Sequence, residues 1–365
     1  MAQPFSFGFS GDDIEEDPND TSNQNAQTAD AAESGPPPVE ARTHDLDELL
    51  STLPSKLSYT QTRITSPKGH TTYLPRRALF DARIQLMAED DIPTSTTSSN
   101  PLPGLTTSDL QPHIYEGGYK TWECALSLCT YLLDRGPRKD LDDLVRVNHV
   151  IELGCGTALP SLLLFQYAVR NGLGLYFTLT DYNADVLRLV TVPNLFLAFV
   201  ATLGLHDAAF PETGKEGKGE ANPLADVDAE EGELDVTPQL IDRFKQTLVE
   251  LGITITLVSG SWSPTQRLLD LVPSSPELNT FILASETIYS PASLVAFTEA
   301  MVALMKRVKS GKAIVAAKRV YFGVGGSVDG FREECAKRGC VAYEMEFDGL
   351  EDGGVRRCLV EVQMY

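Results

Sequence analysis

Residues that could bind a nucleoside lie where two buried strands are expected to end. The apolar run His149–Leu153 leads into Gly154-Cys155-Gly156, after which helical periodicity begins. Glycines in a strand–helix turn let backbone amides approach a ligand closely, beside the point where a parallel sheet opens. Asp181 ends the next strand, 27 residues after Gly154, where a carboxylate can accept both hydroxyls of a ribose. Each feature also has a plain structural interpretation, a tight turn for the glycines and a helix cap for Asp181.

A nicotinamide-dependent oxidoreductase would share the glycine turn and the acid. Two tryptophans with polar neighbours favour a nucleoside cofactor other than a nicotinamide dinucleotide. Trp122, in Lys120-Thr121-Trp122-Glu123-Cys124, precedes the first strand and could fold over the nucleotide cleft. Trp262, in Gly260-Ser261-Trp262, follows the third strand, where its ring could flank an adenine. A single tryptophan belongs to a hydrophobic core more often than to a ligand site. Two of them at strand and helix entrances favour ligand binding.

Strands and helices that alternate from about residue 113 must position these residues. Strands are expected over 149–153, 175–180, 253–258, 280–284, 313–317, 340–347 and 355–364. Helices are expected over 122–133, 159–169, 183–204, 238–251, 264–271, 292–309 and 327–338. This alternation predicts an α/β fold with a doubly wound, mostly parallel, Rossmann-like sheet of about seven strands. The short connection over 348–354 predicts that the last two strands form an antiparallel closing hairpin.

The negative charge is concentrated in two segments. The chain has a net charge of −21, and residues 1–50 contain twelve acidic residues and one arginine. Residues 207–236 contain ten acidic residues and two lysines, so the other 285 residues have a net charge of only −2. This balance argues against binding to duplex nucleic acid, which requires clustered Lys and Arg. We therefore expect no direct nucleic-acid binding.

Cysteine and histidine spacing argues against a zinc site or a disulfide framework, because the six Cys show no paired C-x-x-C spacing and the five His are scattered. We expect no metal. The N-terminus lacks the basic and apolar regions of a secretory signal, and the apolar stretch Val186–Leu205 is interrupted and predicts a buried helix. We expect no association with membranes, and a location in the cytoplasm and nucleus.

Composition divides the chain into three expected parts. Residues 1–43 predict a disordered acidic tail, in which Phe5, Phe7 and Phe9 form either a docking motif or a cluster without a role. Residues 44–110 predict an N-terminal extension packed on the catalytic domain, which covers 111–365. The acidic insertion at about 207–236 predicts a solvated loop.

Several segments, taken together, resemble the protein-histidine N-methyltransferases, a eukaryotic group of seven-β-strand enzymes that use S-adenosylmethionine. The resemblance covers roughly 110–365 well and the N-terminus in patches. It rests on Gly117-Gly118-x-Lys120-x-Trp122-Glu123-Cys124, Glu152-Leu153-Gly154-Cys155-Gly156, Asp181-Tyr182-Asn183, Gly260-Ser261-Trp262, Ser285-Glu286-Thr287-Ile288-Tyr289 and Tyr321-Phe322-Gly323-Val324-Gly325-Gly326. One departure is Ala158, where related methyltransferases often have Gly; Ala fits there if its φ is helical.

The resemblance implies a class I methyltransferase that transfers a methyl group from S-adenosyl-L-methionine to a histidine imidazole nitrogen of a protein. It implies donor contacts from Lys120, Thr121, Trp122, Glu123, Cys124, Glu152, Gly154, Gly156, Asp181, Tyr182, Asn183, Gly260, Ser261, Trp262 and Ser285. The chain also resembles related enzymes at Glu286 and Tyr289, and we therefore expect these two residues to be catalytic. The implied partner is a basic protein substrate, a large-subunit ribosomal protein. A protein-lysine N-methyltransferase of the same fold and a non-catalytic nucleoside-binding adaptor remain the alternatives.

Overall fold

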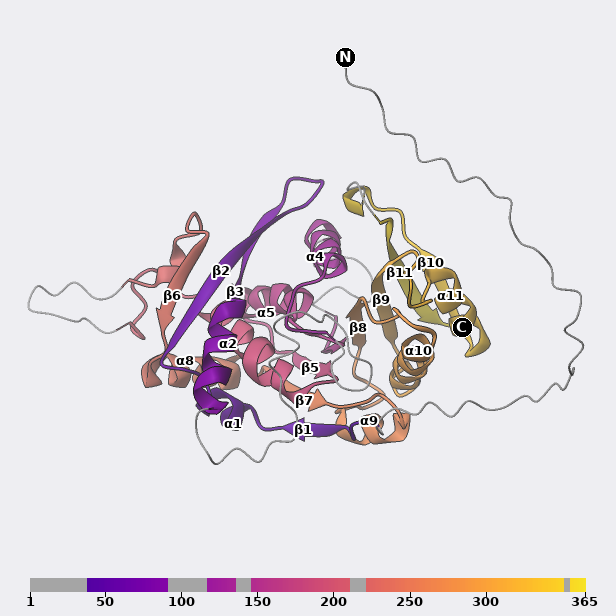
Figure 1. The fold of residues 1–365 in the computed structure, drawn as a ribbon, viewed down its shortest axis with the longest axis horizontal. Helices are drawn as coiled ribbons and strands as arrows, with labels where there is room; N and C mark the ends of the chain where they lie inside the picture. Colours follow the sequence, from indigo (N-terminus) through magenta and orange to yellow (C-terminus); the bar gives the residue numbers. More distant parts are fainter. Residues whose placement is uncertain (1–37, 91–116, 136–145, 211–220, 351–354) are drawn as a thin grey trace, which may run out of the picture. The chain divides into compact units, whose positions relative to one another are not determined.

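The computed structural model describes residues 38–90, 117–135, 146–210, 221–350 and 355–365 (Figure 1). Phe5, Phe7, Phe9 and most of the predicted acidic tail lie outside this part of the chain. The described residues form one compact unit, which already includes residues 38–43. Its ordered chain therefore starts before residue 44, where we expected the extension to begin.

An eight-stranded mixed sheet forms the centre of this unit. Parallel pairing joins five neighbouring strands in the order β7 (Thr254–Ser259), β5 (Tyr176–Asp181), β4 (His149–Leu153), β8 (Thr280–Ser285) and β9 (Gly311–Lys318). Antiparallel strands complete both edges, β1 (Arg42–His44) beside β7, and β11 (Arg357–Met364) followed by β10 (Cys340–Glu344) beside β9. The predicted mostly parallel sheet and closing hairpin are confirmed, and β1 is an eighth strand that we did not predict.

Helices cover both faces of the sheet, which explains why its central parallel strands are largely buried and mostly apolar (Figure 1). One face packs against α4 (Glu123–Arg135), α5 (Leu159–Asn171), α7 (Val192–Val200) and α8 (Pro238–Leu251). The other packs against α9 (Thr265–Leu271), α10 (Pro291–Met305) and α11 (Val328–Lys337). Neighbouring residues of β4 alternate between the two cores, with Val150 in the first and Ile151 in the second.

A second sheet corrects the prediction for the acidic insertion. Its three strands follow the order β3 (Thr71–Arg77), β2 (Lys56–Thr65) and β6 (Glu231–Asp235), accompanied by the helices α1 (Leu46–Ser51) and α2 (Leu79–Asp90). The solvated loop that we expected over 207–236 is wrong for this strand, whose Leu234 is buried against the core. Asn222 is also buried and donates to the carbonyl oxygens of Val200 and Leu203 at 3.0 and 3.1 Å.

Two features are absent from the described residues. None of their helices is long and apolar enough to cross a membrane. No group of three or more His, Cys, Asp or Glu side chains in these ranges is placed to hold a metal ion. All six cysteines are buried free thiols.

Candidate active site

The glycine turn after β4 is shaped by a second loop that crosses it. Gly154 and Gly156 have φ values of 69° and 50°, which favour glycine. A Cβ on Gly156 would lie 3.1 Å from the Cα of Gly118, so the loop at 117–118 lies directly against the turn. The residues that precede the segment expected to cover the donor, Lys120–Cys124, therefore lie next to the glycines.

Asp181, at the end of β5, is oriented by two backbone amides. Its Oδ2 accepts from the amide of Gly156 at 2.9 Å, and its Oδ1 accepts from the amide of Asn183 at 3.2 Å. The residue is 5% exposed. It thus joins the glycine turn to the start of the next helix, and its carboxylate lies at the carboxyl edge of the sheet, where ligands bind in such folds.

Ala158 does not meet the condition under which Ala would fit at this position. Its φ of 58° and ψ of 23° are left-handed and not helical. A residue with a Cβ costs about 1–2 kcal/mol in this region, and burial of the Ala158 methyl group offsets part of that cost.

A π-helical turn over Leu187–Thr191, between α6 (Ala184–Val186) and α7, supports the glycine turn from below. Its Thr191 hydroxyl donates to the carbonyl of Gly156 at 2.7 Å. Asn194 donates to the carbonyl of Thr157 at 3.0 Å. The predicted helix over 183–204 is thus divided by a π turn beside the glycine turn. Such turns are frequently found at functional sites.

Trp262 lies beside the glycine turn. A Cβ on Gly154 would lie 3.6 Å from Cζ2 of this partly buried tryptophan. The indole Nε1 donates to the Thr180 hydroxyl at 3.5 Å, and the ring meets Phe297 edge-on at 5.6 Å. Trp262 therefore packs partly against the core and partly against the glycine turn.

Gly260 and Ser261 contact the N-terminal segment, which sequence reasoning did not place at the site. A Cβ on Gly260 would lie 2.6 Å from the Cα of Ala41, so the crossing chain itself requires glycine here. The amide of Ser261 donates to the carbonyl of Val39 at 2.8 Å, and the amide of Val39 donates to the Tyr182 hydroxyl at 3.2 Å. Residues 38–41 thus form a wall beside the predicted adenine and ribose positions.

The segment from Lys120 to Cys124 connects the glycine turn to the end of β9. Lys120 is exposed at its start, and the Thr121 hydroxyl donates to the Thr157 hydroxyl at 3.1 Å. The ammonium of Lys318 lies 5.4 Å from the centre of the Trp122 ring and 3.3 Å from the Glu123 carboxylate. This cation was missed by sequence reasoning, although it ends a predicted strand as Asp181 does.

Glu286 directly follows β8, with a buried side chain and a strained backbone. Its φ is 59°, and its side chain is 7% exposed. Oε1 has no hydrogen-bond partner and lies 3.7 Å from the Lys318 ammonium. Burial, with the Glu286 carboxylate nearby, raises the pKa of both the Cys124 thiol and the Tyr321 hydroxyl. Cys124 is therefore a buried, protonated neighbour of Glu286.

The ammonium of Lys318 is held charged between two acids. Burial by itself would lower the pKa of Lys318, but the carboxylates of Glu286 and Glu123 outweigh burial and raise it. The ion pair to Glu286 is largely shielded from water, whereas the Glu123 side chain is 61% exposed. Lys318 thus connects the donor-covering segment to the segment expected to be catalytic.

A glycine loop supports the backbone at Tyr289. The amide of Gly326 donates to the carbonyl of Tyr289 at 3.0 Å, and a Cβ on Gly326 would overlap the carbonyl oxygen of Ile288. The loop 321–326 therefore lies directly against the Glu286–Tyr289 segment.

Glu152 and Ser285 lie near the carboxyl ends of β4 and β8. Glu152 is fully buried, and its Oε2 accepts from the amide of Ser161 at 3.0 Å. Burial raises the pKa of Glu152 to about 8. Its contact with Ser161 attaches β4 to α5. Ser285 is the last residue of β8 and is paired with Ala316 of β9.

The residues at this edge fit S-adenosylmethionine. Buried polar atoms without a hydrogen-bond partner gather here, namely Oε1 of Glu286 and the hydroxyl of Thr287, whose methyl group faces Gly154. Asp181 offers a carboxylate for ribose hydroxyls, and Trp262 offers an aromatic surface for an adenine. The sheet therefore brings acceptors and an aromatic ring to one place.

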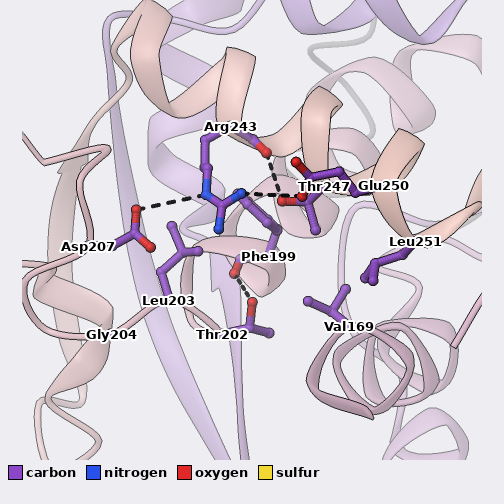
Figure 2. A pocket seen from close by; sticks show the side chains of 10 residues that line it. All are labelled: Val169, Phe199, Thr202, Leu203, Gly204, Asp207, Arg243, Thr247, Glu250 and Leu251. Carbon is purple, nitrogen blue, oxygen red and sulfur yellow. Dashed lines mark hydrogen bonds and ion pairs between the residues drawn. The ribbon is translucent and has the colours of Figure 1, made fainter. Parts of the chain in front are cut away.

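A cavity of about 300 Å³ lies elsewhere, between α5, α7 and α8 (Figure 2). Its lining includes Val169 and Leu251, close to the ends of the helices that precede β5 and β7. These helix ends lie at the amino edge of the parallel sheet. Arg243 extends into it, with Asp207 at 4.0 Å and Glu250 at 3.7 Å. This cavity is therefore separate from the candidate active site.

Comparisons with known proteins identify the family. No protein-family model matches the chain. Histidine protein methyltransferase 1 of Schizosaccharomyces pombe is 35% identical over 339 residues, which cover 92% of this chain and 86% of that protein. The chain belongs to the histidine protein methyltransferases. The Saccharomyces cerevisiae member is 35% identical over 352 residues, 90% of this chain and 89% of that protein. The Mus musculus homologue is 30% identical over 258 residues, 70% of this chain and 59% of that protein.

Solved structures with a weaker likeness are also methyltransferases. The rRNA methyltransferase aviRa from Streptomyces viridochromogenes is 13% identical, with a TM-score of 0.35 over 67% of this chain and 86% of that chain. Human methyltransferase 10 domain containing protein is 14% identical, with a TM-score of 0.33 over 67% of this chain and 85% of that chain.

Membership of this family confirms several predictions. The protein is an S-adenosylmethionine-dependent protein-histidine methyltransferase with a class I methyltransferase fold, and its substrate is a protein. The roles of the individual site residues stay predictions.

Proposed function

We propose that this histidine protein methyltransferase modifies a large-subunit ribosomal protein and that Glu286 accepts a hydrogen bond from the target ring. The buried Oε1 of Glu286, which has no hydrogen-bond partner, carries the proposal. The Lys318 ammonium lies 3.7 Å away, too far for a good hydrogen bond, and a buried acceptor without a hydrogen bond is costly, so this oxygen favours an incoming N–H group. The strained φ of Glu286 is also typical of a functional position.

The target imidazole makes modest demands on the protein. Its ordinary pKa is near 6.5, so most of it is neutral at neutral pH and no strong base is needed. The attacking nitrogen needs a free lone pair, and therefore the proton must reside on the other nitrogen. Glu286 can hold that N–H and select this tautomer. Its carboxylate can also stabilise the positive charge that the ring gains on methylation.

The remaining site residues hold the methyl donor and orient the target imidazole. S-adenosylmethionine, when bound, supplies a methyl group activated by a positively charged sulfur. Gly154 and Gly156 would lie at its methionine part, Asp181 at the ribose, and Trp262 with Ser261 at the adenine. Trp122 would cover the donor, and Tyr289 would shape the entrance for the imidazole. Placing the reacting atoms about 3–3.5 Å apart removes much of the entropic barrier.

Charge supports a ribosomal substrate. The chain has a net charge of −21, and ribosomal proteins are basic, so long-range attraction would raise the encounter rate. Ribosomal proteins are made in the cytoplasm and assembled largely in the nucleus. We therefore also propose that the enzyme acts in these two compartments.

Glu286→Gln tests the role of the carboxylate. Gln keeps the size of the side chain but removes its charge, so we expect kcat to fall by about 10²–10³ while the Kd for S-adenosylmethionine stays within about threefold. Turnover and calorimetric donor binding would be measured on the same preparations. Glu277→Gln is the matched control, because that carboxylate is 75% exposed and pairs only with Lys309 in the described structure. Equal loss of turnover and donor affinity would contradict the assignment.

A further inference from the structure

The loop between β9 and α11 exposes apolar side chains beside the segment expected to be catalytic. Phe322 is 81% exposed, and Val320 and Val324 flank it at 43% and 45%. Single exposed apolar residues are common on proteins, so the exposure of Phe322 alone indicates nothing. The ordered loop that carries Phe322, and the contacts of that loop with the proposed active site, indicate a role.

Hydrogen bonds hold this loop in one conformation. The amide of Tyr321 donates to the carbonyl of Gly326 at 2.9 Å, and the amide of Gly325 donates to the carbonyl of Tyr321 at 3.1 Å. Gly323 and Gly325 have φ values of 82° and 87°, as a tight turn requires. Val320 and Ser327 form an antiparallel bridge at its base. Phe322 is therefore presented on an ordered turn, which lowers the entropy cost of binding through it.

The same loop is joined to the proposed active site on both sides. Tyr321 is buried, and its hydroxyl accepts from the amide of Lys318 at 3.2 Å and faces Glu286. Gly326 donates to the carbonyl of Tyr289. Phe322 follows Tyr321 directly in the chain. Phe322 is therefore one residue away in the chain from a side chain that faces Glu286.

The charge next to the tip is already neutralised. Arg319 pairs with the carboxylate of Glu344 and lies 3.2 Å from Asp329. The tip itself, from Val320 to Gly326, contains no ionisable side chain other than the buried Tyr321 hydroxyl. The surface therefore suits an apolar group better than a charged one.

We propose that Phe322 and Val324 form a docking surface for an apolar side chain that flanks the target histidine in the protein substrate. This inference rests on the proposed function. Phe322 contributes to substrate binding and not to donor binding or to the chemical step. Burial of its ring against the substrate excludes water, which gives apolar contacts their strength.

Phe322→Ser, Phe322→Leu and the control Val249→Ser test this surface in the full-length enzyme. Val249 is 82% exposed on α8, so its loss matches the change in exposed apolar surface. With large-subunit ribosomal proteins as substrate, we expect Phe322→Ser to lower the methylhistidine rate at limiting substrate about tenfold, equivalent to about 1.4 kcal/mol. The rate at saturating substrate and the donor Kd should change less than about twofold. Phe322→Leu should retain most of the wild-type rate, and Val249→Ser all of it.

A second substitution identifies the group that contacts Phe322. Once mass spectrometry locates the methylated histidine, each apolar residue flanking it would be replaced by Ser in the substrate. One such change should lower the rate with the wild-type enzyme but have little further effect with Phe322→Ser, because both remove the same contact.

Three outcomes would overturn the inference. One is that the wild-type enzyme is active and Phe322→Ser forms methylhistidine at the same rate at limiting substrate. Another is that the losses of rate caused by Phe322→Ser and by each substrate substitution simply add when the two are combined. The third is a fall from dimer to monomer on Phe322→Ser, which would make the tip a contact between copies of the chain. Absence of methylhistidine from the wild-type enzyme would instead contradict the proposed function itself.

Discussion

Glu152 should make the protein less stable as the pH rises, and Glu152→Gln should remove this dependence. The carboxyl is fully buried at the end of β4. Burial raises its pKa to about 8 from an ordinary 4.5, against the opposing effect of hydrogen bonds from Ser161, and the charge of Asp181 adds to the rise. Glu152 is therefore mostly protonated at neutral pH in the folded protein and ionised in the unfolded chain.

The sign and size follow from proton linkage. Between the two pKa values the folded protein binds more protons than the unfolded chain, so the free energy of unfolding falls as the pH rises. The contribution is complete below pH 4.5 and is lost as the pH rises through about 8. At 1.36 kcal/mol for each pKa unit, the loss is on the order of 4–5 kcal/mol. Gln has the same shape and no proton to release, so it should escape this loss.

Urea unfolding of both proteins at about pH 5 and about pH 9 measures the effect. The wild-type protein should lose several kcal/mol more than Glu152→Gln between these conditions. Glu361→Gln, which removes another buried carboxylate, would show whether any buried acid gives the same result. Parallel pH profiles for the wild type and Glu152→Gln would refute the reasoning.

Two further predictions concern His149 and Lys318. Burial, with a smaller effect of Arg307, lowers the pKa of His149 to about 4, so its contribution to stability is complete above pH 6.5 and is lost as the pH falls through about 4. His149→Gln should therefore reduce acid destabilisation by about 3 kcal/mol in urea unfolding near pH 4, and an unchanged acid profile would contradict this. Lys318→Met should both raise the donor Kd and lower kcat, about tenfold each, because Lys318 contacts Trp122 and Glu286. Lys318→Arg should recover part of both, and loss confined to thermal stability would leave Lys318 a purely structural residue.

The sequence predicted the parallel sheet well because each of its strands is buried on both faces. Apolar runs such as His149–Leu153 and Thr280–Ala284 have one dominant interpretation when helices alternate with them. The short β1 was missed, since Arg42–His44 has no apolar pattern and forms only through pairing with β7. The strand β6 was missed for a related reason: acidic residues alternate there with a single buried leucine, Leu234.

The sequence predicted which residues belong to the candidate site better than it predicted which residues contact one another there. The rule that polar residues at strand ends gather at one edge selected Asp181, whereas Glu286 came from the family resemblance; applied to β9, the same rule would have selected Lys318. No local pattern could reveal that residues 38–41 lie against Gly260, because that contact joins segments more than 200 residues apart. The left-handed Ala158 also escaped prediction, since Ala rarely adopts that conformation.

Transfer of labelled methyl from S-adenosylmethionine to large-subunit ribosomal proteins, followed by acid hydrolysis and amino-acid analysis, tests the central claim most directly. The account predicts label in methylhistidine, and much less label with Glu286→Gln. Label in methyllysine would contradict the proposed target residue. An enzyme that binds S-adenosylmethionine but transfers no label to these proteins would contradict the proposed ribosomal substrate.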